Sequence, residues 1–225
     1  MVSVTFLGHA SFIVEINRKI IYIDPWFDNS SKQFKRLVRS VGNAETIRKA
    51  DFVLISHEHP DHLDSYAVAR IAERTSAQVI GPDQVLEQLN INPRLKMSVR
   101  VGDSFELNGI EFHVMQAKHP QSVYPVGYLI KSGSESVYFS GDTYDFYGMS
   151  QIDCKVALLP IGGHYTMDSY AAVKALKMMR AKYVIPCHYD TFDKIQTDVY
   201  DFQKRVKRDT KSEAIILTPG ESVTL

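Results

Sequence analysis

The residues best suited to chemistry are concentrated in the segment His57-Glu58-His59-Pro60-Asp61-His62. Imidazole and carboxylate groups are ligands for Zn²⁺, Mn²⁺ and iron. In an extended segment, residues two apart point the same way, so His57 and His59 can converge on one point. Pro60 forces a bend, after which Asp61 and His62 can face a second point nearby. A loop of solvated histidines is the weaker alternative, because histidine is an uncommon residue.

Three further candidate ligands stand where predicted strands end, on what would be the same edge of the fold. They are His119 after the strand at 110–117, Asp142 after the strand at 136–139, and His188 after the strand at 182–186. Gly141 permits the sharp turn that leads into Asp142. Each residue alone is weak evidence, but together with segment 57–62 they supply a full ligand set for two metal ions.

The elements that must position these residues follow from hydrophobic periodicity. Strands are predicted at 2–6, 11–16, 19–23, 52–55, 78–80, 97–100, 104–107, 110–117, 126–130, 136–139, 156–160, 182–186, 214–217 and 222–225. Helices are predicted at 63–72, 83–89, 169–179 and 198–208, with a short one at 33–38. The order indicates two halves of strands followed by helices, without a linker rich in Pro, Gly or Ser. Two sheets packed face to face with helices outside satisfy it, as one α/β domain over residues 1–225 without a cap.

The composition excludes several classes of protein. The 225 residues are 44% hydrophobic, and 26 basic residues balance 26 acidic ones, so nucleic acid is not an expected partner. Two cysteines, Cys154 and Cys187, are too few for a disulfide framework. There is no apolar run of the ~20 residues that span a bilayer. The start of the chain lacks the features of a signal peptide, so we expect a cytoplasmic protein.

The pattern HxHxDH, a later histidine, Gly141-Asp142-Thr143 and a final histidine resemble the metallo-β-lactamase fold superfamily. The early Ile23-Asp24-Pro25 resembles the first motif of that family. The segments Gly8–Phe12 and Pro160–Asp168 are similar to a compact branch of metal-dependent hydrolases related to ascorbate-6-phosphate lactonase and N-acyl phosphatidylethanolamine phospholipase D. The resemblance implies a four-layer αββα sandwich with its site at one edge.

The resemblance also implies a role for each ligand. His57, His59 and His119 would bind the first metal; Asp61, His62 and His188 would bind the second; Asp142 would bridge both. The cofactors would be two divalent ions, with Zn²⁺ preferred and Mn, Fe or Ni as alternatives. Ions ~3.5–4 Å apart can share a hydroxide that acts as nucleophile, which Asp61 would orient. Asp24 is interpreted as an acceptor that holds a ligand imidazole in place.

Two other histidines, His9 and His164, lie in loops beside predicted strand ends. Either could contact the substrate or donate a proton to the leaving group, or could simply be hydrogen-bonded inside the protein. His164 is the stronger candidate for substrate contact, and Tyr165 and Tyr189 have less support. The cavity walls would come from loops near 26–45 and 161–168, or from a neighbouring subunit in a homo-oligomer.

The leading hypothesis is a hydrolase of an ester-like bond in a small molecule, either a phosphodiester or a lactone or carboxylic ester. β-Lactamase activity is disfavoured because Asp142 stands where the secreted zinc β-lactamases carry a cysteine. Two alternatives from other classes remain: a non-catalytic metal-binding or sensor protein, and a di-iron oxidoreductase of the same fold.

Overall fold

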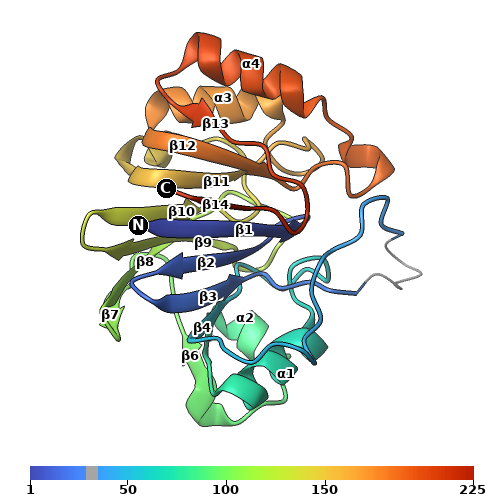
Figure 1. Ribbon diagram of the computed structural model, residues 1–225, viewed down its shortest axis with the longest axis vertical. Helices are drawn as coiled ribbons and strands as arrows, with labels where there is room; N and C mark the ends of the chain where they lie inside the picture. Colours follow the sequence, from blue (N-terminus) through green and yellow to red (C-terminus); the bar gives the residue numbers. More distant parts are fainter. Residues whose placement is uncertain (29–34) are drawn as a thin grey trace.

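The computed structural model describes residues 1–28 and 35–225, which form two sheets packed face to face (Figure 1). Helices α3 (Ser169–Met178) and α4 (Val199–Asp209) cover the outer face of one sheet. Helices α1 (Ser65–Thr75) and α2 (Asp83–Leu86) cover the outer face of the other. The expected four-layer α/β sandwich is therefore confirmed.

Each sheet has seven strands in the described part of the chain. The first has the order β14-β1-β2-β3-β4-β5-β6 and the second the order β13-β12-β11-β10-β9-β8-β7. The strands of the first sheet are β1 (Val2–Gly8), β2 (Ser11–Ile16), β3 (Lys19–Ile23), β4 (Phe52–Leu54), β5 (Gln78–Gly81), β6 (Lys96–Ser98) and β14 (Ser222–Thr224). Those of the second are β7 (Ser104–Leu107), β8 (Ile110–Gln116), β9 (Val126–Ser132), β10 (Glu135–Phe139), β11 (Asp153–Pro160), β12 (Arg180–Cys187) and β13 (Glu213–Ala214). Among the described residues, three short 3₁₀ turns complete the elements: η1 (Pro93–Leu95), η2 (Tyr147–Gln151) and η3 (Asp193–Ile195).

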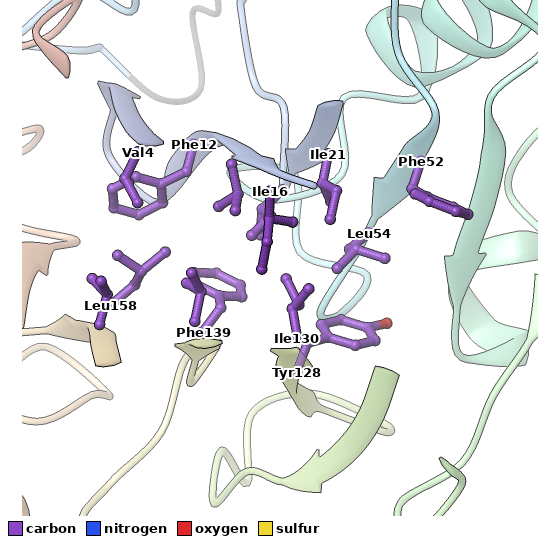
Figure 2. Packing of buried hydrophobic residues seen from close by; sticks show 14 of the residues in the cluster. Val4, Phe12, Ile16, Ile21, Phe52, Leu54, Tyr128, Ile130, Phe139 and Leu158 are labelled. Atoms are coloured by element: carbon purple, nitrogen blue, oxygen red, sulfur yellow. The ribbon is translucent and has the colours of Figure 1, made fainter. Parts of the chain in front are cut away.

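Successive side chains of a strand point to opposite faces of its sheet, so each sheet has an apolar face, and these two faces pack together. Phe12 and Leu54 of the first sheet face Tyr128 and Phe139 of the second, and all four are almost fully buried (Figure 2). Burying a side chain of this size contributes roughly 1.5–3 kcal/mol relative to leaving it exposed. The layer between the sheets is therefore the main core, and two smaller apolar layers lie beneath the helix pairs.

Strand direction explains why the candidate ligands meet. Strands β3 and β4 are parallel, and β1 shares their direction because β2 is antiparallel to both β1 and β3. In the second sheet β8, β10, β11 and β12 likewise run in one direction. The segments that leave their carboxyl ends meet at one edge of the sandwich, as the sequence pattern predicted, because ligand atoms of His57, His59 and His119 from the two sheets lie within 4.8 Å of one another.

A tight turn joins β4 to α1 and orients the motif. The amides of His62 and Leu63 both donate to the carbonyl of His59, at 2.9 and 2.8 Å. Asp64 then caps the helix, because its Oδ1 accepts from the amide of Ala67 at 2.9 Å. The bend expected at Pro60 thus becomes the turn that separates the two halves of the motif.

Not every predicted element is present. The predicted helix at 33–38 begins on residues outside the described part of the chain, and residues 35–38 are not helical. The amide of Leu37 donates instead to the carbonyl of Thr191 at 2.8 Å, and the guanidinium of Arg36 lies 3.8 Å from the centre of the Trp26 ring. Tertiary contacts therefore override the local preference. In the described part of the chain, no helix combines the length and apolar character that crossing a membrane requires.

Candidate metal centre

The first group of candidate ligands consists of His57, His59 and His119, from two different sheets. One ligand nitrogen from each lies within 4.8 Å of the others. His57 and His59 follow β4 in the first sheet, and His119 follows β8 in the second. The ring centres of His57 and His59 are 4.6 Å apart, which confirms that residues two apart in this segment converge.

Hydrogen bonds on the outer side of each ring determine which nitrogen faces the group. His59 Nε2 donates to the carbonyl of Gln121 and His119 Nδ1 donates to the carbonyl of Tyr165, both at 3.1 Å. A neutral imidazole carries one proton, so the opposite nitrogen keeps its lone pair. His59 Nδ1 and His119 Nε2 are consequently left as ligand atoms, 3.2 Å apart.

The second group consists of Asp61, His62 and His188, joined by His9. Their ligand atoms also lie within 4.8 Å of one another. His188 enters directly after β12, and its amide donates to the carbonyl of His9 at 2.7 Å. The Nε2 of His9 lies 3.2 Å from Oδ2 of Asp61. Residues of the segment 57–62 therefore contribute to both groups, and ligand atoms of Asp24, His57 and His62 also lie within 4.8 Å of one another.

Asp142 lies between the two groups. Its Oδ2 is 3.2 Å from Nε2 of His188, 3.8 Å from Nε2 of His119 and 4.0 Å from Nε2 of His57, and its Oδ1 is 3.3 Å from Nε2 of His62. Gly141 makes this position accessible because its φ of 59° lies in the left-handed region. One carboxylate thus faces histidines of both groups.

Asp24 supports both groups from beneath and is completely buried. Its Oδ2 accepts from His62 Nδ1 at 2.7 Å and from the hydroxyl of Ser56 at 2.5 Å, and its Oδ1 accepts from the amide of Ser56 at 2.7 Å. The Ser56 hydroxyl oxygen in turn accepts from His57 Nδ1 at 2.9 Å. Asp24 therefore directs Nε2 of one histidine in each group toward the centre, which is the position that sequence reasoning proposed for it.

The donor set fits divalent cations. The Nε2 atoms of His57, His62 and His188 and Oδ1 of Asp142 are buried and, among the described residues, make no hydrogen bond, although two of these nitrogens lie 3.2–3.3 Å from a carboxylate oxygen of Asp142. Leaving such groups without a partner costs about 1–3 kcal/mol each, which coordination would remove. Although burial opposes the charged form of His62, Asp142 and Asp24 raise its pKa well above the ordinary value. The carboxylates of Asp142 and Asp24 therefore favour a positive charge at the position of His62.

A cavity of about 670 Å³ opens over the centre. Ligands from both groups line it, and so do His164 and Tyr165 from the loop after β11. His164 is thus at the cavity, where the sequence placed it. His9 is buried, with 1% of its surface exposed, and does not border the cavity.

Sequence reasoning missed the cavity wall formed by Phe192, Asp193, Lys194 and Ile195. The expected wall from residues 26–45 contributes Lys35. A signal for residues 192–195 was present, because they begin four residues after the candidate ligand His188. They carry no metal-ligating pattern, however, and the loop folds over the site through tertiary contacts.

The fold and the centre define a class. The family model described as the β-lactamase superfamily domain matches residues 19–189, and the structural neighbours are metallo-β-lactamase fold proteins. The chain belongs to this superfamily, as a metal-dependent hydrolase with a cluster of histidines and aspartates able to bind metal.

Relatives share almost the full length of the chain. A UPF0173 metal-dependent hydrolase of Thermofilum pendens is 31% identical over 233 residues, which cover 99% of either chain. Igni18, a metallo hydrolase from Ignicoccus hospitalis, is 31% identical with a TM-score of 0.86, over 100% of this chain and 98% of that one. CmlA, a diiron β-hydroxylase from Streptomyces venezuelae, has a TM-score of 0.75 at 13% identity, over 100% of this chain and 54% of its own. That last likeness shows the fold alone.

Proposed function

We propose that the protein is a dinuclear hydrolase that cleaves an ester-like bond in a small molecule. In this proposal His57, His59 and His119 hold one divalent ion, and Asp61, His62 and His188 hold the other. Asp142 is shared between them. Zn²⁺ is the preferred ion, with Mn, Fe or Ni as alternatives.

The observation that carries the proposal is the position of Asp142. Its two oxygens lie 3.2–4.0 Å from histidines of both groups, a span that suits a carboxylate ligand shared by two ions. A site for one ion would need only one of the two groups. The orphaned Nε2 atoms on both sides of Asp142 support the same assignment.

When bound, two ions supply a water activated for attack at neutral pH and a Lewis acid that polarises the substrate oxygen. The chain's own groups then divide the remaining work. Asp61 borders the cavity and is held by His9, so it orients the attacking water. His164 also borders the cavity and is the candidate for donating a proton to the leaving group.

The cavity favours a substrate of modest size. A volume of about 670 Å³ lies within the range of ordinary small-molecule sites. The electrophile is either a phosphodiester or a lactone or carboxylic ester, because the same activated water attacks both.

Metal content provides the first test. Protein purified without chelator and reconstituted with Zn²⁺ or Mn²⁺ should hold two ions per chain, measured by elemental analysis. One ion per chain after reconstitution would contradict the dinuclear assignment. Iron-dependent absorbance coupled to oxygen consumption, without hydrolysis, would support an oxidoreductase instead.

A substrate panel provides the second test. Phosphodiesters, lactones, carboxylic esters, thioesters and β-lactams should be assayed with the native enzyme, Asp61→Ala and the control Asp193→Ala. Asp193 borders the same cavity, but its side chain is exposed and outside both ligand groups. We expect Asp61→Ala to lose nearly all turnover and Asp193→Ala to retain most of it. Equal activity in the two variants would refute the role of Asp61.

A further inference from the structure

Tyr165 has a backbone conformation that is unusual for its residue type. Its φ of 65° lies in the left-handed region, although it is not a glycine. Gly163, two residues earlier, has a φ of 81°, and its amide donates to the carbonyl of Met167 at 3.1 Å. The loop is therefore a tight turn closed on itself. Non-glycine residues held in this region cost of order 1–3 kcal/mol and occur mostly where the surrounding structure uses them.

The backbone of Tyr165 contacts a candidate metal ligand. Its carbonyl accepts the Nδ1 proton of His119 at 3.1 Å, which leaves His119 Nε2 facing the centre. The loop is anchored behind this point, because the amide of Met167 donates to the carbonyl of Thr143 at 2.9 Å, next to Asp142. The left-handed turn thus aims the carbonyl at the ligand.

The side chain of Tyr165 has a different environment. Half of its surface is exposed, and both Tyr165 and His164 line the cavity. The two ring centres are 4.0 Å apart at an interplanar angle of 51°. The apolar residues Phe192 and Ile195 line the same cavity. The ring of Tyr165 therefore offers an accessible aromatic surface to a molecule in the cavity.

We propose that Tyr165 has two separable roles: its carbonyl positions His119, and its ring, with that of His164, contacts a flat apolar group next to the scissile bond. The substrate class is therefore an ester that carries an aryl or similarly planar substituent. This inference rests on the hydrolytic function proposed above, since it assumes that the substrate occupies this cavity. Stacking on an aromatic ring accounts for a discrimination of roughly fivefold between planar and small substituents.

Substitutions can separate the two roles because residue types differ in their tolerance of a positive φ. Tyr165→Asn keeps a residue that accepts this region but removes the ring. Tyr165→Val removes the ring and strongly disfavours the region, and Tyr165→Phe keeps the ring and loses only the hydroxyl. Tyr147→Ala is the control, because Tyr147 is 84% exposed and does not border the cavity.

Each variant is characterised by two binding measurements, neither of which depends on catalytic activity. Calorimetry should give the affinity of metal-loaded protein for phenylphosphonate and for methylphosphonate, and competition with a chelator should give the metal affinity. We expect Tyr165→Asn to bind phenylphosphonate about fivefold more weakly, with methylphosphonate and metal affinity unchanged. Tyr165→Val should additionally lose about tenfold or more in metal affinity. Tyr165→Phe and Tyr147→Ala should match the native protein.

Several outcomes would overturn the inference. If the native protein binds phenylphosphonate no better than methylphosphonate, or binds neither, the planar-substituent class is wrong even if hydrolysis is found. Equal metal affinity in Tyr165→Val and the native protein would refute the positioning role. The protein could prefer phenylphosphonate through Tyr165 and yet hydrolyse nothing in the substrate panel. That result would support the contact between Tyr165 and a planar group, and it would reject the hydrolytic function.

Discussion

Oδ2 of Asp24 lies 2.7 Å from Nδ1 of His62, in a position where neither side chain is exposed to solvent. The same oxygen accepts the hydroxyl proton of Ser56, whose oxygen accepts the Nδ1 proton of His57. One carboxylate therefore controls the orientation of a histidine in each ligand group. Such outer partners commonly change metal affinity by about 10–100-fold when they are lost.

Asp24→Asn tests this relationship with almost no change of shape. Asp24 has a φ of 41°, a region that asparagine tolerates, so the backbone should persist. An amide NH₂ accepts no proton, so asparagine cannot replace both acceptor oxygens of Asp24 toward Ser56 and His62, and we expect metal affinity to fall about tenfold to a hundredfold. Competition with a chelator measures the change. Asp51→Asn, at an acid that binds Lys19 and the amide of Ile20 away from the centre, should leave the affinity unaltered.

His9 should influence turnover through Asp61. Burial and the neighbouring His188 lower the pKa of His9 to about 3, so its imidazole is neutral at pH 7 and donates its one proton from Nε2 to Asp61. His9→Asn keeps a residue that tolerates the φ of 57° but cannot reach Asp61. We expect kcat to fall about tenfold or more, as for other lost outer partners. His9→Gln, which can reach, should recover part of the rate, and failure of both variants to change kcat would contradict this role.

Removal of metal should lower stability as well as activity. Ligand binding at a thousandfold excess over Kd stabilises a folded chain by about 4 kcal/mol. For a chain of this size that corresponds to a Tm decrease of roughly 10 °C after chelation, measured by calorimetry. Re-addition of Zn²⁺ should restore the Tm. An Asp142→Ala variant should show a smaller decrease on chelation, and an equal decrease would imply that the chelator acts elsewhere.

Gly141 and Gly133 form a matched pair that separates backbone strain from crowding. Their φ angles are 59° and 58°, but a Cβ at Gly141 would lie 2.7 Å from the carbonyl oxygen of Val126, whereas a Cβ at Gly133 meets nothing within 4 Å. Each alanine substitution costs about 1–2 kcal/mol of left-handed strain. Gly141→Ala should lose more unfolding free energy in urea than Gly133→Ala, and it alone should lose metal. Equal stability of the two variants would show that the contact with Val126 relaxes freely.

Much of the centre could be predicted because metal ligation uses few residue types at short spacing. The convergence of His57 with His59 follows from strand geometry, and the turn before α1 follows from Pro60 and the cap at Asp64. The strands were recognisable because buried and more exposed residues alternate along many of them. The helix expected at 33–38 was wrong over its described residues, since Leu37 bonds to Thr191, a partner 154 positions away that no local pattern reveals.

The sequence by itself determined the kinds of ligand, the strand ends that carry them and the sandwich that brings those ends to one edge. Only the tertiary structure decided which nitrogen of each histidine faces the centre, because that depends on carbonyl and hydroxyl partners such as Tyr165 and Ser56. It also decided that the loop after His188 walls the cavity and that His9 lies beneath it. Periodicity reports which face of an element is buried, whereas the direction of a hydrogen bond depends on the neighbour that the fold supplies. For that reason the segment at 57–62 was enough to predict a metal site. The orientation of its histidine rings and that of His119 depends on hydrogen bonds with Asp24, Ser56 and Tyr165.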